Sequence, residues 1–478
     1  MAVHYDIVII GGGSGGLVVA SAAAQLKAKV ALVEKDKLGG DCLWYGCVPS
    51  KSLIHAARVA YEVKHASRFG TYANSPTLDF TKAAGHVHSA IAAIQPHDSP
   101  ERFRGLGVEV IFGSGQFIDA HTFEVNGHQL TARNFVISTG SRPAIPPIDG
   151  LEEAGYLTNE RVFELTERPD SLAIIGSGPI GCELGQAFHR LGARVTIFSS
   201  RDRILPKEDP EAAAVVEKQL EAEGISILKN ARAERVELID GKKCVWAGKE
   251  KVLVDEILVS AGRKPNIESL NLEAAGVEYS KKGIKANEAL QTSNPRIYAC
   301  GDVIGGYQFT HVAGYEAVVV LTNALFSPIK KWFPSKADYR VIPWATFTDP
   351  ELARVGLTEE QARKRYGEEV RILKQPFEGV DRAQAEGATD GFAKLIVTEK
   401  GDILGAHLVG KSAGELIHEI VLAMRYKLKV SALSGIHIYP TLSEVNSKAA
   451  LLLQKEKFAN NERLHGVLKT VFGFLRSR

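Results

Sequence analysis

The sequence predicts an α/β protein that contains two similar strand–turn–helix–strand units. Residues 5–34 hold a short β-branched run, a glycine-rich turn, an alanine-rich helical stretch and a second β-branched run. Residues 171–198 repeat this order. Short apolar runs of this kind are typical of parallel strands that are covered on both faces. The chain of 478 residues is long enough for about three domains.

The overall composition excludes several classes of protein. A net charge of +2 with 24% charged residues indicates neither a nucleic-acid partner nor a disordered tail. Five cysteines are too few for a disulfide scaffold, which indicates a reducing compartment. The apolar start "IVIIGGGSGGLVVASAAA" lacks a basic flank, and every apolar run of about 18 residues is broken by charge or glycine clusters. We therefore predict a cytoplasmic protein without a transmembrane segment.

The first unit carries the spacing of a dinucleotide-binding turn. Gly11 allows the tight turn, Gly13 lets the backbone approach a pyrophosphate, and Gly16 lets helix and strand pack closely. The N-terminus of the following helix offers free N–H groups to the phosphates. Glu34, at the end of the second strand, can accept hydrogen bonds from a ribose. This combination predicts a Rossmann-like domain for one dinucleotide.

The second unit repeats the same glycine spacing. Gly176, Gly178 and Gly181 lie between an apolar strand and a helix, and a second strand follows that ends at Phe198. Two such units in one chain indicate two bound dinucleotides.

The two units differ at the end of their second strands. Where Glu34 ends the first unit, the second reads "SSRDR" from residue 199, with Arg201 and Arg203 in place of a carboxylate. Guanidinium groups suit the 2′-phosphate of NADP, so we favour NADPH at this site. NADH stays an alternative, because Gly181 is compatible with it.

Cys42 and Cys47 follow the first unit, in the run "GGDCLWYGCVPSK". A thiolate at the start of a helix is stabilised by the helix dipole, which favours a redox-active pair. Zinc is the alternative, although no second Cys or His pair has ligand spacing, and we predict no metal site. Inert thiols are the third possibility, which we expect of Cys182, Cys244 and Cys300 as small buried side chains.

These motifs resemble a known family. The pattern GG-x-C-x4-C-x-P-x-K is similar to the redox segment of the FAD-dependent pyridine nucleotide–disulfide reductases, which include glutathione reductase, dihydrolipoamide dehydrogenase and mercuric reductase. The runs "FVISTGSRP", "DEILVSAGRKPN", "TSNPRIYACGDV" and "FTDPELARVGLTE" resemble further segments of this family, in the same order. The resemblance covers essentially the whole chain. It implies cofactor contacts at Gly140, Gly262, Gly301 and Asp302.

The resemblance also implies a domain order. We expect an FAD domain at residues 1–148 and 265–338, interrupted by an NAD(P) domain at residues 149–264. An α+β dimerisation domain would then occupy residues 339–478. The implied enzyme is an obligate homodimer, in which the segment from His437 to Glu444 completes the partner subunit's site.

The resemblance further implies roles for individual side chains. NAD(P)H would reduce FAD, and FAD would reduce a Cys42–Cys47 disulfide, with Cys47 on the flavin side and Cys42 exposed to substrate. Lys51 matches the family's lysine near the flavin, and Glu183 matches its partner. A buried lysine needs such a partner because an unpaired buried charge is costly. Asp41 departs from the family, which has a small threonine there.

The most important departure lies near the C-terminus. Disulfide-reducing members of the family carry a histidine directly before a proline, oriented by a glutamate. Here Tyr439 stands in the place of that histidine, Glu444 is retained, and His437 lies two residues earlier. A phenol with a pKa of about 10 exchanges a thiol proton less readily than an imidazole with a pKa of about 6.5. We therefore expect ordinary thiol–disulfide exchange to be weak.

Three functions are compatible with these features. The first is a mercuric reductase-like NAD(P)H oxidoreductase that acts on a disulfide, a soft metal ion or a thiol-bound acceptor, since mercuric reductases also lack this histidine and "FTHVAGYEA" resembles them. The second is a dihydrolipoamide dehydrogenase for a lipoyl protein, with Tyr439 as an unusual base. The third is a slow redox-sensing flavoprotein.

The last residues of the sequence add two expectations. They read "TVFGFLRSR" and hold no cysteine, whereas mercuric reductases end with a cysteine pair that collects Hg(II). We therefore expect inefficient mercury detoxification. Residues 465–478 mix apolar and basic side chains, which favours docking on the chain's own dimer, with a membrane or another partner as alternatives.

Overall fold

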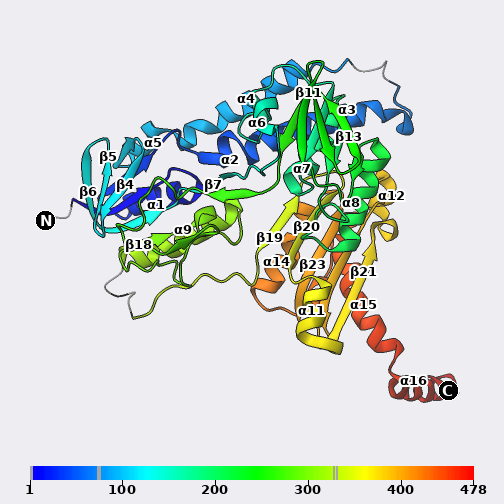
Figure 1. The fold of residues 1–478 in the computed structure, drawn as a ribbon. Helices are drawn as coiled ribbons and strands as arrows, with labels where there is room; N and C mark the ends of the chain where they lie inside the picture. Colours follow the sequence, from blue (N-terminus) through cyan, green and yellow to red (C-terminus); the bar gives the residue numbers. More distant parts are fainter. Residues whose placement is uncertain (1–3, 73–76, 327–328, 330–331, 478) are drawn as a thin grey trace. The chain divides into compact units, whose positions relative to one another are not determined.

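The computed structural model of the protein describes residues 4–72, 77–326, 329 and 332–477 (Figure 1). The chain forms two compact units. The first contains Met1–Asp202 and Ile225–Asp338, and the second contains Arg203–Gly224 and Tyr339–Arg478. The domain ranges expected from the sequence stay a prediction.

The first unit is built around a seven-stranded sheet of order β3-β2-β1-β6-β5-β4, with β18 paired to β6. Strands β3, β2, β1, β6 and β18 are parallel, and β4, β5 and β6 form an antiparallel meander. The bounds of these strands are β1 Tyr5–Ile10, β2 Val30–Glu34, β3 Val108–Phe112, β4 Gly115–Asp119, β5 Thr122–Val125, β6 His128–Ile137 and β18 Ile297–Ala299.

Strand β1 shows why this sheet needs an apolar run rather than an alternating one. Ile7 and Ile9 pack into one core, with side chains of helices α1 (Ser14–Gln25) and α9 (Thr310–Leu325). Val8 and Ile10 pack into a second core on the opposite face. Successive residues of a strand point to opposite faces, so both faces of the sheet are covered.

A second parallel sheet in the same unit has the order β10-β9-β8-β14. A three-stranded antiparallel sheet, β11-β12-β13, and the short pairs β7–β15 and β16–β17 complete its strands. Their bounds are β7 Ser141–Pro143, β8 Ser171–Ile175, β9 Arg194–Phe198, β10 Ser226–Leu228, β11 Arg235–Ile239, β12 Lys242–Ala247, β13 Glu250–Val254, β14 Glu256–Val259, β15 Arg263–Pro265, β16 Tyr279–Ser280 and β17 Gly283–Ile284.

The remaining helices of the first unit connect these strands or cover them. They are α2 Gly40–Trp44, α3 Cys47–Lys64, α4 Phe80–Ile94, α5 Pro100–Gly105, α6 Leu151–Ala154 and α7 Pro179–Arg190. Short 3-10 turns join them, of which Gly301–Ile304 bears on the site below.

The second unit has a five-stranded antiparallel sheet of order β19-β20-β23-β22-β21. Its strands are β19 Pro343–Thr346, β20 Glu351–Gly356, β21 Val370–Pro376, β22 Phe392–Thr398 and β23 Ile403–Gly410. Its helices are α8 Pro210–Glu223, α11 Glu359–Tyr366, α12 Asp381–Glu386, α13 Ala413–Leu416, α14 His418–Arg425, α15 Glu444–Ala459 and α16 Glu462–Arg476.

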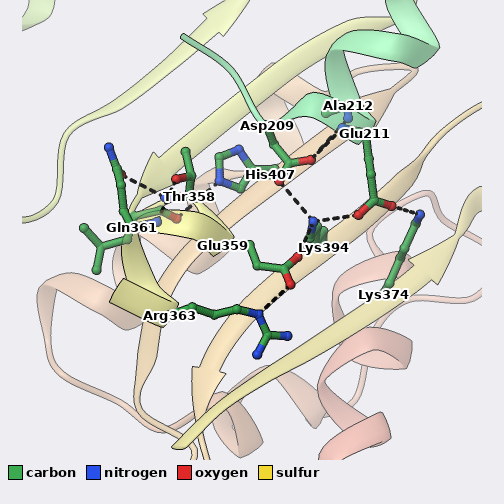
Figure 2. A network of polar contacts seen from close by, with 11 residues as sticks. Asp209, Glu211, Ala212, Thr358, Glu359, Gln361, Arg363, Lys374, Lys394 and His407 are labelled. Atoms are coloured by element: carbon green, nitrogen blue, oxygen red, sulfur yellow. Dashed lines mark hydrogen bonds and ion pairs between the residues drawn. The ribbon is translucent and has the colours of Figure 1, made fainter. Parts of the chain in front are cut away.

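A buried charge cluster joins α8 to this sheet (Figure 2). Lys394 on β22 is only 2% exposed, and its Nζ lies 3.0 Å from Asp209, 2.8 Å from Glu211 and 2.7 Å from Glu359. Asp209 also caps α8, because its Oδ1 accepts hydrogen bonds from the first-turn N–H groups of the helix. Burial alone would lower the pKa of Lys394, but the three carboxylates raise it above the ordinary lysine value.

The predicted α/β fold class is confirmed. Two parallel sheets carry the two repeated units, and a separate α+β unit contains the C-terminal region. The three cysteines expected to be inert, Cys182, Cys244 and Cys300, are all buried, as predicted.

Candidate active site

The first glycine turn is compressed against the sheet in a way that only glycine permits. Gly11 has φ +105°, and a Cβ there would lie 2.5 Å from the carbonyl oxygen of Ser138. A Cβ on Gly16 would lie 1.9 Å from the carbonyl oxygen of Gly11. The Ser138 hydroxyl donates to that same carbonyl at 2.9 Å. The spacing predicted from the sequence therefore corresponds to real close packing.

The backbone N–H groups and the carboxylate around this turn fit a dinucleotide. Gly13 precedes the first turn of α1, which contains no acidic side chain, so its N-terminal N–H groups are suited to a pyrophosphate. The buried Glu34 carboxylate lies beside the turn, where one oxygen accepts from the Gly12 N–H at 2.7 Å and the other from the Asp36 N–H at 2.8 Å. This arrangement fits the adenosine and phosphate groups of FAD.

The second turn has the same geometry in the second parallel sheet. Gly176 has φ +121°, and a Cβ there would lie 2.5 Å from the carbonyl oxygen of Ser260. A Cβ on Gly181 would lie 2.1 Å from the carbonyl oxygen of Gly176, and the Ser260 hydroxyl donates to that carbonyl at 3.1 Å. Gly178 precedes α7 with open space around its Cα. The structure thus repeats the pair of contacts made by Ser138.

The end of β9 differs from the end of β2. Ser199 is fully buried and accepts a hydrogen bond from the Ser177 hydroxyl at 2.8 Å, so no carboxylate takes the position of Glu34. The Arg201 N–H donates to the Ser199 hydroxyl oxygen at 3.2 Å, and Arg201 is exposed. Arg203 belongs to the second unit, where its guanidinium donates to the Pro206 carbonyl at 3.1 Å.

Gly140 and Gly262, two of the predicted cofactor contacts, each precede one strand of a short two-stranded ribbon. Gly140 precedes β7 with φ +66°, and Gly262 precedes β15 with φ +134°. β7 and β15 pair antiparallel. Arg263 on β15 donates to Ser141 on β7 at 2.7 Å. This ribbon ties together segments that are far apart in the sequence.

Asp302 lies against this ribbon. It follows Gly301, whose N–H donates to the buried carboxylate of Glu316 at 2.6 Å. The Ser141 hydroxyl donates to Asp302 at 2.5 Å, and Arg263 lies 3.5 Å from the same carboxylate. Burial raises the pKa of Asp302, while Ser141 and Arg263 oppose that shift. This position is compatible with the cofactor contact that the family resemblance implies for Asp302.

Asp41, the departure noted beside the cysteines, has a partner in this cluster. Its Oδ1 lies 3.3 Å from an Arg263 guanidinium nitrogen and accepts a hydrogen bond from Asn159 at 3.1 Å. Arg263 therefore holds two carboxylates, Asp41 and Asp302. The sequence pattern did not single out Arg263 or Asn159, although Arg263 stands in the quoted run "AGRKPN".

The two candidate redox cysteines lie on consecutive helices. Cys42 is on α2 and half-buried, whereas Cys47 is the first residue of α3 and exposed. The Sγ of Cys47 lies 3.3 Å from Oγ1 of Thr310, which is the first residue of α9. The positive ends of two helix dipoles therefore face one sulfur. Thr310 was missed from the sequence, although it stands in the quoted run "FTHVAGYEA".

The two thiols titrate as an asymmetric pair. A hydrogen bond between them lowers the pKa of Cys47 and raises the pKa of Cys42. Burial opposes the shift at Cys47, whereas Thr310 and the Lys51 charge support it. The reduced pair is therefore expected to hold a thiolate at Cys47 and a thiol at Cys42.

The structure brings Lys51 and Glu183 together. Lys51 Nζ donates to Glu183 Oε2 at 2.9 Å, with the Lys51 side chain 37% exposed and the Glu183 side chain 6% exposed. Lys51 lies one turn into α3, and Glu183 lies one turn into α7, the helix that follows the second glycine turn. The pair therefore connects the helix that begins at Cys47 to the helix that follows the second glycine turn.

The second unit holds Tyr439 and Glu444, but they do not bond to each other. The Tyr439 hydroxyl is part of a 66% exposed side chain and donates to Asp381 at 3.0 Å. This hydrogen bond raises the pKa of Tyr439 above its ordinary value. Glu444 Oε2 is buried and has no hydrogen-bond partner among the described residues. The Glu444 carboxylate is retained, but the Tyr439 hydroxyl that it would orient donates to Asp381 instead.

His437 does not take the place of the missing histidine in this unit. Its Nδ1 lies 2.8 Å from the Gly435 carbonyl, and its Nε2 lies 3.0 Å from Glu419. Glu419 is itself held by Asn446 at 3.0 Å. Both ring nitrogens face acceptors, so neither is directed toward a substrate.

Family models match nearly the whole chain. The model described as pyridine nucleotide-disulphide oxidoreductase matches residues 5–317, and the dimerisation domain of the same family matches residues 342–450. This chain belongs to the pyridine nucleotide-disulphide oxidoreductase family. It is accordingly an FAD-dependent oxidoreductase that uses NAD(P)H, as the resemblance predicted.

Curated relatives of the chain include mercuric reductases and dihydrolipoyl dehydrogenases. The chain is 37% identical to a mercuric reductase from Staphylococcus aureus over 459 residues, covering 95% of this chain and 83% of that protein. It is 34% identical to a dihydrolipoyl dehydrogenase from Chlamydia pneumoniae over 472 residues, covering 97% of this chain and 99% of that protein. Identity at this level shows that the chain belongs to the family, but it does not identify the electron acceptor.

A solved structure of the family has the same fold. The HOCl-induced flavoprotein disulfide reductase RclA from Escherichia coli matches with a TM-score of 0.84 and 29% identity, covering 94% of this chain and 100% of RclA. A Cu(II) complex of RclA matches equally well, with 29% identity and a TM-score of 0.84.

The described part of the chain shows neither a membrane-spanning helix nor a cluster of metal ligands. No helix there is both long enough and apolar enough to cross a membrane. No three His, Cys, Asp or Glu side chains gather there as ligands for a metal ion.

Proposed function

We propose that this protein is an NADPH-dependent, mercuric reductase-like flavoprotein that delivers electrons through Cys42 and Cys47 to a soft-metal, thiol-bound or disulfide acceptor. FAD, when bound, accepts a hydride from the nicotinamide and supplies two electrons to the protein sulfurs. The first glycine turn with Glu34, and the cluster around Asp302, support the place of FAD. The second glycine turn supports the place of the nicotinamide nucleotide.

The cysteines store the electron pair. Breaking the Cys42–Cys47 bond takes up two electrons and leaves a thiolate and a thiol, with one proton bound at Cys42. Thr310 and Lys51 favour the thiolate at Cys47. When the S–S bond forms again, two electrons and the Cys42 proton leave the pair toward the acceptor.

The hydrogen bond from Tyr439 to Asp381 is the observation that carries the choice of acceptor. It raises an already high phenol pKa, so Tyr439 is a poor acid or base for thiol exchange at neutral pH. A soft metal ion or a thiol-bound metal needs no such proton transfer to the protein. This argument favours the mercuric reductase-like function over ordinary disulfide exchange.

An acceptor panel under anaerobic conditions tests the proposal. NADPH oxidation would be followed with Hg(II)–thiol complexes, glutathione disulfide, oxidised lipoamide and a quinone, and the metal complex is expected to give the highest kcat/KM. Cys42→Ser and Cys47→Ser should each abolish turnover, whereas Cys244→Ala, at a buried cysteine of β12, should not. Full turnover in either serine variant would exclude the sulfur route.

Dihydrolipoyl dehydrogenase activity is the second candidate. One observation favours it: the chain covers 99% of a dihydrolipoyl dehydrogenase but 83% of a mercuric reductase. Tyr439 would then be its unusual base. Oxidation of dihydrolipoamide by NAD+ at a rate above all members of the acceptor panel would replace the leading proposal with this one.

NADPH selectivity is the next part of the proposal. The buried Ser199 and the exposed Arg201 at the end of β9 support a 2′-phosphate rather than a free ribose diol. Arg201→Ala should lower kcat/KM for NADPH about tenfold and leave that for NADH unchanged. A preference for NADH in the unmodified protein would overturn this part alone.

The assembly is the last part. We propose a homodimer in which Tyr439 and Glu444 of one subunit act at the cysteine pair of the other, because the family's dimerisation domain covers residues 342–450. Sedimentation velocity should give a dimer at micromolar concentration. A fully active monomer would contradict it.

A further inference from the structure

Helix α16 (Glu462–Arg476) has no buried residue, although much of it is apolar. Asn461 caps it through a hydrogen bond to the Leu464 N–H at 3.0 Å, so its start is well defined. Val467 is 60% exposed, Phe472 is 51% exposed and Leu475 is 59% exposed. Exposed apolar side chains in such density are unusual for a surface that meets only water.

The apolar side chains lie on one side of the helix. At 3.6 residues per turn, the spacing of the apolar positions places them on one continuous face. This apolar face consists of Leu464, Val467, Leu468, Val471, Phe472 and Leu475. The opposite face carries Glu462, Gly466, Lys469, Thr470 and Gly473.

Charge distinguishes the possible occupants of the apolar face. Arg463 borders this face on one side and Arg476 on the other, and Lys469 adds a third cation against the single acid Glu462. Long cationic side chains at the borders of an apolar stripe can keep their charges in water while the stripe is buried. Pairing two copies of this helix would bring together two net positive charges, whereas an anionic surface would attract it.

The position of α16 in the chain also argues against the family's dimer contact as the surface that buries the apolar face. The dimerisation domain ends at residue 450, and α16 begins at Glu462. Helix α16 therefore lies outside the part of the chain that the family's dimerisation model matches.

We propose that α16 is an interfacial helix that binds the surface of an anionic lipid membrane. The apolar face would enter the boundary between headgroups and acyl chains, with Arg463 and Arg476 at its borders among the lipid phosphates. This binding is independent of the acceptor and of the nucleotide that the enzyme uses.

Vesicle sedimentation with the full-length holoprotein tests the proposal. Vesicles of phosphatidylcholine with about a third phosphatidylglycerol should bind the protein, and pure phosphatidylcholine should bind it at least about tenfold less. Raising NaCl from about 0.1 M to about 0.5 M should weaken binding, because the attraction is screened.

Two neighbouring substitutions provide a matched pair. Val471→Glu and Thr470→Glu add the same charge to α16, but only the first lies on the apolar face. Val471→Glu should reduce binding to the anionic vesicles at least about tenfold, and Thr470→Glu should reduce it much less. NADPH oxidation should be unchanged in both variants, which shows that they are folded.

Several results would overturn the proposal. These are no binding to anionic vesicles, equal binding to both vesicle types, or equal loss in the two variants. If Val471→Glu instead converts a dimer to a monomer in sedimentation velocity and vesicles do not bind, the occupant of the apolar face is a second copy of the chain.

Discussion

Lys51 Nζ lies 2.9 Å from Glu183 Oε2, and this pair connects the helix that begins at Cys47 to the helix that follows the second glycine turn. The Glu183 side chain is almost fully buried, and a buried carboxylate is costly to leave without a cation beside it. The pair therefore couples the position of the cysteine helix to that of the second glycine turn, and its loss is expected to affect both.

Lys51→Met should slow the bleaching of the FAD absorbance by NADPH about tenfold or more. The substitution removes the cation beside Cys47 and leaves Glu183 without this counter-charge. Anaerobic stopped-flow absorbance measures the rate. Lys64→Met, at the exposed end of the same helix, is the control and should react at the normal rate. An unchanged rate in Lys51→Met would remove the proposed role.

Thr310→Val should move the acid limb of the kcat–pH profile to higher pH by about one unit. The thiolate forms above the pKa of Cys47, which the folded protein lowers, so activity normally extends to lower pH than an ordinary thiol would allow. Removing the Thr310 hydroxyl takes away one cause of that lowering. Thr322→Val is the control, because its hydroxyl donates to the Val318 carbonyl of the same helix at 2.8 Å. Coincident profiles would mean that Thr310 does not tune the sulfur.

Tyr439→His should increase turnover of glutathione disulfide or lipoamide about tenfold or more. The unpartnered oxygen of Glu444 is available to orient an imidazole, which can exchange a thiol proton at neutral pH. Steady-state kinetics with both disulfides measure the gain. Tyr439→Phe removes only the bond to Asp381 and should not produce it. Lower activity of Tyr439→His toward every acceptor would show that the phenol itself is required.

Lys394→Met should destabilise the second unit by about 3–5 kcal/mol, because it leaves the buried Asp209 carboxylate without the cation that lies beside it. Urea unfolding followed by circular dichroism measures the loss. Lys374→Met is the matched control: Lys374 also pairs with Glu211, but its side chain is 40% exposed, so the expected change is below about 1 kcal/mol. Equal effects of the two substitutions would show that burial does not set the strength of this cluster.

The sequence by itself determined the α/β class, the two glycine turns, the position of the cysteine pair and the family. These features are local, because a glycine spacing between a strand and a helix, or two cysteines before a proline, can be recognised without knowing what packs against them. Gly11 and Gly176 illustrate this, since the turn at each glycine can be predicted from the residues directly around it.

Only the tertiary structure decided what each reactive group touches. Thr310 at Cys47, Arg263 between Asp41 and Asp302, and Tyr439 bonded to Asp381 all join segments that are distant in the sequence. The pKa of a thiol or a phenol depends on burial and on charges within a few ångströms, and local sequence patterns do not specify these neighbours. Folding brings them together, and the chemistry of the site follows from that proximity.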